Sequence, residues 1–145
     1  MADNTKESVL TLTLRDVNGN LIPGQGVLFK ADLSGTVISG TREDTPGIYT
    51  ATLKGTKSGD AHITVTLNGN AFNVAGTTVT LTADSTNPDN GKSELTATPD
   101  TIVADGADKS VLKLILKDAN GNLVSGQTVL FSTDLADTTF DTVVA

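Results

Sequence analysis

The residues whose types could do chemistry stand in a short polar stretch that occurs twice, at residues 16–20 and 118–122. Carboxylate and amide oxygens at alternate positions bind Ca²⁺ in EF-hand loops, which also need a glycine at the sixth position and a bidentate glutamate at the twelfth. Counted from Asp16, the glycine comes fourth and the twelfth residue is Val27. The second copy fails in the same way, so neither stretch fits an EF-hand calcium loop.

A tight turn explains the repeated stretch better than a metal site does. Asn-Gly tolerates positive φ at both central positions, so the pair can close a turn between two strands. The carboxylates of Asp16 and Asp118 would then accept hydrogen bonds from nearby backbone amides. We therefore interpret both stretches as turns, with some other carboxylate arrangement between domains as the alternative.

His62 is the single histidine of the chain, so one chain holds neither a histidine metal cluster nor a histidine-containing triad. It stands between Ala61 and Ile63, on the outward side of an alternating apolar pattern. We expect an exposed strand histidine without a chemical role.

The adjoining carboxylates of Glu43 and Asp44 are a second candidate, because a pair of carboxylates can hydrolyse glycosides. Such clefts are normally lined by aromatic side chains, and the chain has one Tyr and no Trp. In the expected strand at residues 48–53, Tyr49 and Ala51 lie on the same face. We expect Tyr49 and Phe72 to pack in or near the core. The sequence therefore predicts no catalytic, cofactor-binding or metal-binding residue and no enzyme.

Composition excludes further classes of function. The net charge is −7, from 10 basic and 17 acidic residues, and such a surface repels phosphate backbones, so nucleic acid is not an expected partner. No apolar run approaches the roughly 20 residues of a membrane span. With no cysteine, the chain has no disulfide and no thiolate zinc site. The first residues lack the pattern of a signal peptide, so a protein that works outside the cell would need an export signal further upstream.

The two polar stretches belong to a longer internal repeat. Residues 9–33 and 111–135 are identical at 16 of 25 positions without a gap, at an offset of 102 residues. That period is too long for a solenoid repeat and has the size of a whole β-sandwich domain. We expect two tandem copies in which the first lacks the strand that corresponds to residues 93–103 and the second is truncated before its midpoint.

The elements around the polar stretches are predicted to be strands. Leu10, Leu12 and Leu14 alternate with polar residues in residues 9–15, and residues 61–67 and 77–83 alternate in the same way. Residues 26–33 and 48–53 complete the set, with turns rich in Gly, Asn, Asp and Pro between them. The fold class is therefore all-β, an Ig-like antiparallel β-sandwich, with a first sandwich over residues 1–87, a linker at 88–92 and the first half of a second at 93–145.

Two longer segments resemble a known family. "TIVADGADKSVLKLILKDANGNLVSGQTVLFS" is similar to the opening half of the bacterial Ig-like modules, group 1, of the intimin and invasin adhesins, and "GIYTATLKGTKSGDAHITVTLNG" is similar to the later half. The resemblance implies β-sandwiches strung together on the outside of a Gram-negative bacterium. A β-barrel outside this sequence would anchor them in the outer membrane. No receptor-binding residue is implied.

These observations predict a non-catalytic stalk or adhesion module that spaces a distal binding domain from the outer membrane. The alternative is direct binding of a host protein or glycan through the loops, for which exposed aromatic or arginine side chains in turns are expected but scarce. The expected partners are neighbouring Ig-like repeats and, through other domains, a host receptor. Because the first copy lacks a strand, residues 93–103 could complement its open edge, within the chain or in a strand-swapped homodimer.

Overall fold

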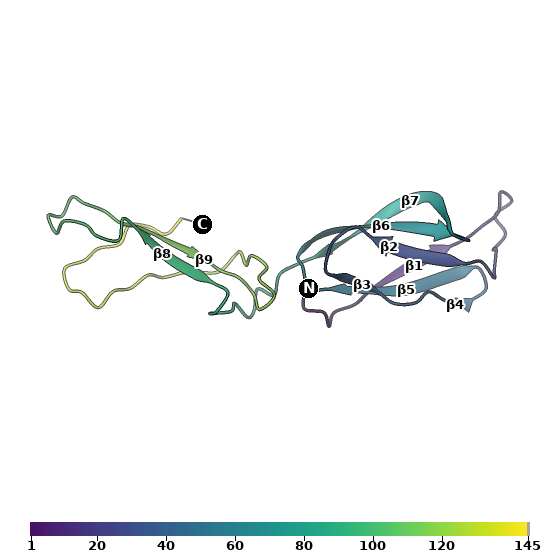
Figure 1. The fold of residues 1–145 in the computed structure, drawn as a ribbon, viewed down its shortest axis with the longest axis horizontal. Coiled ribbons are helices and arrows are strands. Elements are labelled where there is room, and N and C mark those ends of the chain that lie inside the picture. The colour runs from purple at the N-terminus through teal and green to yellow at the C-terminus, as the bar shows by residue number, and fades with distance from the viewer. Residues whose placement is uncertain (145) are drawn as a thin grey trace.

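The computed structural model describes residues 1–144, and these form strands joined by turns and loops, without a helix. The strands are β1 Ser8–Thr13, β2 Val27–Ala31, β3 Thr36–Ile38, β4 Arg42–Thr45, β5 Ile48–Gly55, β6 Gly59–Leu67, β7 Asn70–Leu81, β8 Glu94–Thr98 and β9 Val111–Ile115. Strands β1 to β7 lie in residues 1–84, which we call the first unit, and β8 and β9 lie in residues 89–144, the second unit. The two units lie end to end along the longest axis of the molecule (Figure 1).

The first unit is a sandwich of two antiparallel sheets, as the alternating patterns predict. One sheet has the order β1-β5-β3, with β4 also paired to β5, and the other has the order β2-β6-β7. Strands β3 and β4 were not predicted from the sequence. They are short, and β4 is exposed along its whole length, so neither carries the alternation that marks a half-buried strand.

The core lies between these two sheets and consists of the residues predicted to point inward. Leu10, Leu12 and Leu14 are buried, and so are Ala61, Ile63 and Val65 of β6. Every residue of the buried core cluster belongs to the first unit. Burial of this apolar surface, at about 25 cal/mol per Å², is the main stabilising contribution to the sandwich.

The turn between β6 and β7 has the geometry that the sequence predicts for an Asn-Gly pair. Leu67 pairs with Asn70, and the two residues between them, Asn68 and Gly69, have φ of 49° and 84°. Positive φ at both central positions is typical of a type I′ turn, which suits the right-handed twist of a hairpin.

The second unit differs from the first in what supports it. Strands β8 and β9 form a two-stranded sheet, and all five residues of β8 are exposed. A single two-stranded hairpin is marginally stable in water. The turn that follows β9, at residues 118–122, makes hydrogen bonds to the end of the first unit and so links this sheet to it.

Candidate functional site

The repeated polar turn closes in the same way in both units, and its geometry departs from the expected one. In each copy the aspartate amide and the second asparagine carbonyl are hydrogen bonded, at 2.9 Å for Asp16 with Asn20 and 2.9 Å for Asp118 with Asn122. Within each loop the glycine, Gly19 in the first copy, has positive φ (85°), whereas the preceding asparagine does not. The expectation of positive φ at both positions is therefore wrong here. The geometry is that of a three-residue hairpin loop that ends in a left-handed glycine.

The aspartate carboxylate organises this loop from within. Asp16 Oδ1 accepts the backbone amides of Asn18 at 2.9 Å and Asn20 at 2.8 Å, and Asp16 Oδ2 accepts Asn20 Nδ2 at 2.9 Å. These hydrogen bonds, chiefly the one from the Asn20 side chain, lower the pKa of Asp16. Its oxygens are thus occupied by donors of the same loop, which is what we expect of a turn.

The second copy of the turn makes the same internal hydrogen bonds. Asp118 Oδ1 accepts the amides of Asn120 and Asn122, each at 2.9 Å, and Asp118 Oδ2 accepts Asn122 Nδ2 at 2.9 Å. Two identical carboxylate-centred loops therefore stand in the two units, at positions 102 residues apart.

The second copy of the turn also contacts the first unit. Within the described residues, the first copy contacts no other unit. Asn122 Oδ1 accepts the backbone amide of Ser58 at 2.7 Å, and Asn122 Nδ2 donates to the carbonyl of Thr56 at 2.9 Å. Both partners lie in the turn between β5 and β6. One side chain thus satisfies a backbone donor and a backbone acceptor of another unit.

Two further contacts extend this junction. Asp118 Oδ2 accepts the backbone amide of Asp84 at 3.0 Å, and Asn120 Nδ2 donates to the carbonyl of Ala2 at 2.9 Å. Asp118 is 1% exposed and Asn122 6%. The end of the first unit therefore covers the polar turn of the second unit and leaves its buried groups paired, as burial of charge demands.

Ionised Asp118 is stabilised at this junction in spite of its burial. Burial alone would raise the pKa of Asp118, but hydrogen bonds from the side chain of Asn122 and the amides of Asp84, Asn122 and Asn120 hold it below the ordinary value of 3.8. The carboxylate therefore remains charged at neutral pH and strengthens its hydrogen bonds to the first unit.

The connection between the units is itself fixed. The Asp89 amide donates to the carbonyl of Lys117 at 2.7 Å, and Pro88 forms an isolated bridge with Asp118. The side chain of Gln127 donates to the carbonyl of Ser85 at 3.0 Å. The connecting segment, residues 85–89, is thus held by hydrogen bonds to the second unit near its polar turn.

The other residues considered from the sequence serve structural roles. Glu43 accepts the amides of Gly47 at 2.7 Å and Gly24 at 3.0 Å, and the first of these is the main cause of its lowered pKa. Tyr49 is 2% exposed, as predicted, and its hydroxyl donates to Ile22 O and accepts Gln25 N.

His62 is exposed, as expected, but it is not without a partner. Its Nδ1 lies 2.8 Å from Asp32 Oδ2, and Asp32 Oδ1 accepts the His62 amide at 2.8 Å. Asp32 is close in space but thirty positions away in sequence, so the alternating pattern gave no signal for this pair.

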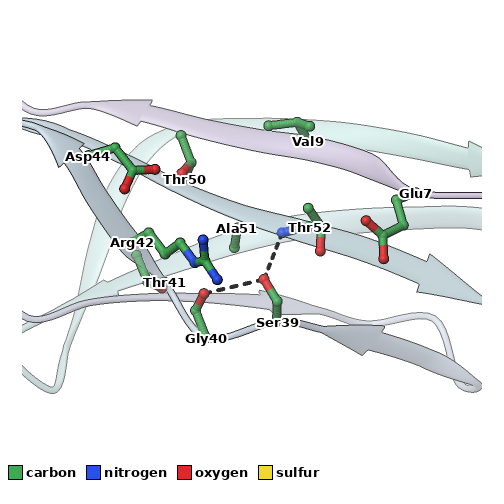
Figure 2. A pocket seen from close by; sticks show the side chains of 10 residues that line it. All are labelled: Glu7, Val9, Ser39, Gly40, Thr41, Arg42, Asp44, Thr50, Ala51 and Thr52. Atoms are coloured by element: carbon green, nitrogen blue, oxygen red, sulfur yellow. Dashed lines mark hydrogen bonds between the residues drawn. The ribbon is translucent and has the colours of Figure 1, made fainter.

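A surface hollow lies on the outer face of the β1-β5-β4 side of the sandwich (Figure 2). It is open, with a volume of about 650 Å³, and its walls include Glu7, Val9, Arg42 and Thr52. Ser39 Oγ accepts the Thr52 amide at 2.9 Å across its floor. None of the residues that line it is aromatic, so it offers no stacking platform for a sugar.

Within residues 1–144, no group of three histidine, cysteine, aspartate or glutamate side chains could hold a metal ion. No helix of this part of the chain is long and apolar enough to cross a bilayer.

Residues 1–84 and, separately, residues 89–145 match the family described as "Invasin, domain 3". The chain belongs to the invasin domain 3 family. It is 30% identical over 140 residues to the inverse autotransporter adhesin YeeJ of Escherichia coli K12, which covers 95% of this chain and 6% of that relative.

Solved structures of invasin-like adhesins agree with this assignment. The crystal structure of invasin, a bacterial integrin-binding protein, matches with a TM-score of 0.73 and 37% identity over 88% of this chain and 26% of that one. The structure of InvD from Yersinia pseudotuberculosis matches with a TM-score of 0.73 and 36% identity over 94% of this chain and 39% of that one. The chain thus spans well under half the length of these relatives.

Membership of the invasin domain 3 family confirms the predicted resemblance to Ig-like modules of the intimin and invasin adhesins. The all-β, Ig-like sandwich is confirmed as well. The module is an adhesin domain of the bacterial cell surface and not an enzyme.

Proposed function

We propose that this invasin domain 3 module is a stalk segment, which holds a distal binding domain of a larger adhesin away from the outer membrane. The observation that carries the proposal is the junction at Asp118 and Asn122. A stalk works as a spacer when neighbouring modules keep a fixed angle, and four hydrogen bonds from one polar turn to backbone groups of another unit restrict that angle.

The domain division is part of this proposal. It assigns residues 1–87 to an Ig-like sandwich that lacks its first strand, residues 88–92 to a linker and residues 93–145 to the first half of a second repeat. The contacts of Pro88 and Asp89 with the turn at Lys117 and Asp118 support a short, fixed linker. The anchor in the outer membrane and the receptor-binding domain are proposed to lie in other parts of the parent protein.

The neighbouring Ig-like repeats are the partners that this function requires. β1 lies at an edge of its sheet and pairs with β5 on one side, whereas β8 pairs with β9 of its own unit. A second copy of the chain could add its residues 93–103 to the β1 edge, which is the proposed strand-swapped homodimer. Sedimentation over a range of concentrations tests it: a monomer at every concentration would contradict the exchange.

Small-angle X-ray scattering of the chain tests the stalk function. The proposal predicts an elongated particle that agrees with the end-to-end arrangement of Figure 1. A chain carrying both Asp118→Asn and Asn122→Ala should scatter as a broader set of shapes with a smaller mean length. A collapsed particle, or identical scattering of the two chains, would contradict a spacer that depends on this junction.

Direct binding of a host protein or glycan is the alternative function, and invasin is described as integrin-binding. The surface that would serve is the hollow lined by Val9, Arg42 and Thr52. Because this hollow is open and has no aromatic residue in its lining, it supports a binding role less than the fixed junction supports a stalk. A hit on a glycan array or in a screen of host surface proteins that Arg42→Ala abolishes would support this alternative, and no hit in either would contradict it.

A further inference from the structure

The turn at Asp16, Asn18 and Asn20 repeats the main internal hydrogen bonds of the docked turn of the second unit, but within residues 1–144 it contacts no other module. Its internal hydrogen bonds have the same partners and, within 0.1 Å, the same lengths as those of the docked copy. In this chain Asp16 is partly exposed and Asn20 is exposed, whereas their counterparts Asp118 and Asn122 are buried. The two turns therefore differ in what covers them and not in how they are built.

Two of the side-chain groups that make the junction in the second unit, Asn122 Oδ1 and Asn120 Nδ2, have counterparts in the first that are unpaired within residues 1–144. Asn122 uses its Oδ1 and Nδ2, and Asn120 uses its Nδ2, to bind the neighbouring unit. Within the described residues, the Asn20 Oδ1 and the side chain of Asn18 have no hydrogen-bond partner. A rigid loop thus presents a preformed set of donors and acceptors, which lowers the entropic cost of binding.

The position of this turn fits a partner at the far end of the sandwich. β1 runs from the N-terminal end, where Asn4 N bonds to Gly55 O, to the opposite end, where Leu14 N bonds to Gly47 O. The second unit docks at the first of these ends, and residues 16–20 lie at the second (Figure 1). A module bound there would extend the end-to-end line on the side opposite to the second unit.

We infer that the Asp16 turn is a second docking site, and that its partner is the Ala2–Thr56–Ser58–Asp84 end of a preceding module of this same kind. Asn20 binds the backbone of the partner's residues 56 and 58, Asn18 binds the carbonyl of its residue 2, and Asp16 binds the amide of its residue 84. The repeat offset of 102 residues gives every one of these contacts a counterpart in the observed junction.

The same offset supplies β1 with a neighbouring strand. β8 pairs with β9 from Glu94↔Ile115 to Thr98↔Val111. Shifted back by the repeat, residues 94–98 of a preceding module would lie beside residues 9–13, at the edge of the sheet that β1 occupies. Docking of the turn and completion of the sheet thus require the same partner in the same place.

The inference rests on the proposed stalk function, and it is tested in a chain in which residues 1–102 precede the full sequence. This upstream copy carries the complete core cluster of the first unit, so it has what it needs to fold. The probe is hydrogen exchange at the Ser58 amide of the upstream copy. Asn20→Ala in the downstream copy should speed that exchange about tenfold or more, because it removes the acceptor that protects the amide.

Three comparisons make the result specific. In the original chain, Asn20→Ala should leave exchange at Ser58 unchanged, because Asn122 is the acceptor there. Asn18→Ala in the downstream copy should speed exchange of the extended chain's upstream end without disturbing the turn, since only its backbone amide takes part in the loop. In the extended chain, Asn122→Ala should speed exchange at the downstream Ser58.

The outcomes separate this inference from the stalk function. If Asn122→Ala speeds exchange at its Ser58 and Asn20→Ala has no effect at the upstream Ser58, the second docking site is wrong and the observed junction stands. If neither substitution changes exchange, the junction itself does not hold in solution, and the stalk function fails together with the inference.

Discussion

Asn122 Oδ1 accepts the backbone amide of Ser58 at 2.7 Å, across 64 positions of sequence and between two separate sheet systems. The same side chain donates to the Thr56 carbonyl at 2.9 Å, so it closes the β5–β6 turn of the first unit from outside. Removal of this side chain would leave both backbone groups without their partner. The energetics of the module's junction are therefore concentrated on few atoms, and they can be tested one residue at a time.

The Asn122→Ala substitution should loosen the second unit by roughly 1–3 kcal/mol, the usual cost of a buried polar group left unpaired. The measurement is denaturant unfolding followed by amide signals of β8 and β9. The matched control is Asn20→Ala in the same chain, which removes the equivalent side chain from an exposed turn. Equal losses in the two variants would show that the contact with Ser58 contributes nothing.

Acid should weaken the junction through Asp118. Its pKa is lowered in the folded protein, so the ionised form stabilises the fold. The contribution is fully present above the ordinary value of 3.8 and is lost as the pH falls through the lower folded-state pKa. The Asp118→Asn chain should start less stable at pH 7 and lose less stability on acidification below pH 4. An identical acid profile for the two chains would contradict this role.

The Gly47→Ala substitution should be among the most damaging changes in the first unit. Gly47 has φ of 77°, and a Cβ there would lie 2.8 Å from the Cβ of Leu21 and 3.1 Å from the amide nitrogen of Ile22. Gly19 has a similar φ of 85° with open space around it. Thermal unfolding should therefore show a loss of roughly 1–2 kcal/mol for Gly19→Ala, from backbone strain alone, and a clearly larger loss for Gly47→Ala.

The hydroxyl of Tyr49 ties a loop to the core, and its removal should cost roughly 1–3 kcal/mol. It donates to Ile22 O at 3.0 Å and accepts Gln25 N at 2.9 Å, both in the loop that follows the polar turn. Tyr49→Phe keeps the ring in place and removes both bonds. Unfolding by urea with an unchanged m-value would measure the loss, and wild-type stability would refute the assignment.

Much of this fold could be predicted because its signals are local. Leu10 and Leu12 alternate with threonines, and that pattern alone identifies the buried face of β1. β4 was missed because its residues are exposed on both sides and pair with β5 through a register shift. Its position depends on tertiary contacts such as Glu43 with Gly47, which no local pattern encodes.

The candidate site shows the same division between local and distant information. The carboxylate-centred turn at Asp16 follows from the types and spacing of its residues, although its glycine geometry differs from the expected one. The docking of the Asp118 copy on Ser58 and Asp84 does not follow, because backbone amides have no sequence signature. The repeat itself was the available clue, since two identical polar turns in one short chain suggest a shared structural task.

The orientation of β8 and β9 relative to the first unit is the quantity that tests the central claim most directly, and residual dipolar couplings of the backbone amides measure it. If the polar turn fixes the junction, one alignment tensor fits the couplings of both units in the wild-type chain, and two are needed once Asn122→Ala and Asp118→Asn are introduced. If the wild-type chain already requires two unrelated tensors, the units move independently and the account is contradicted.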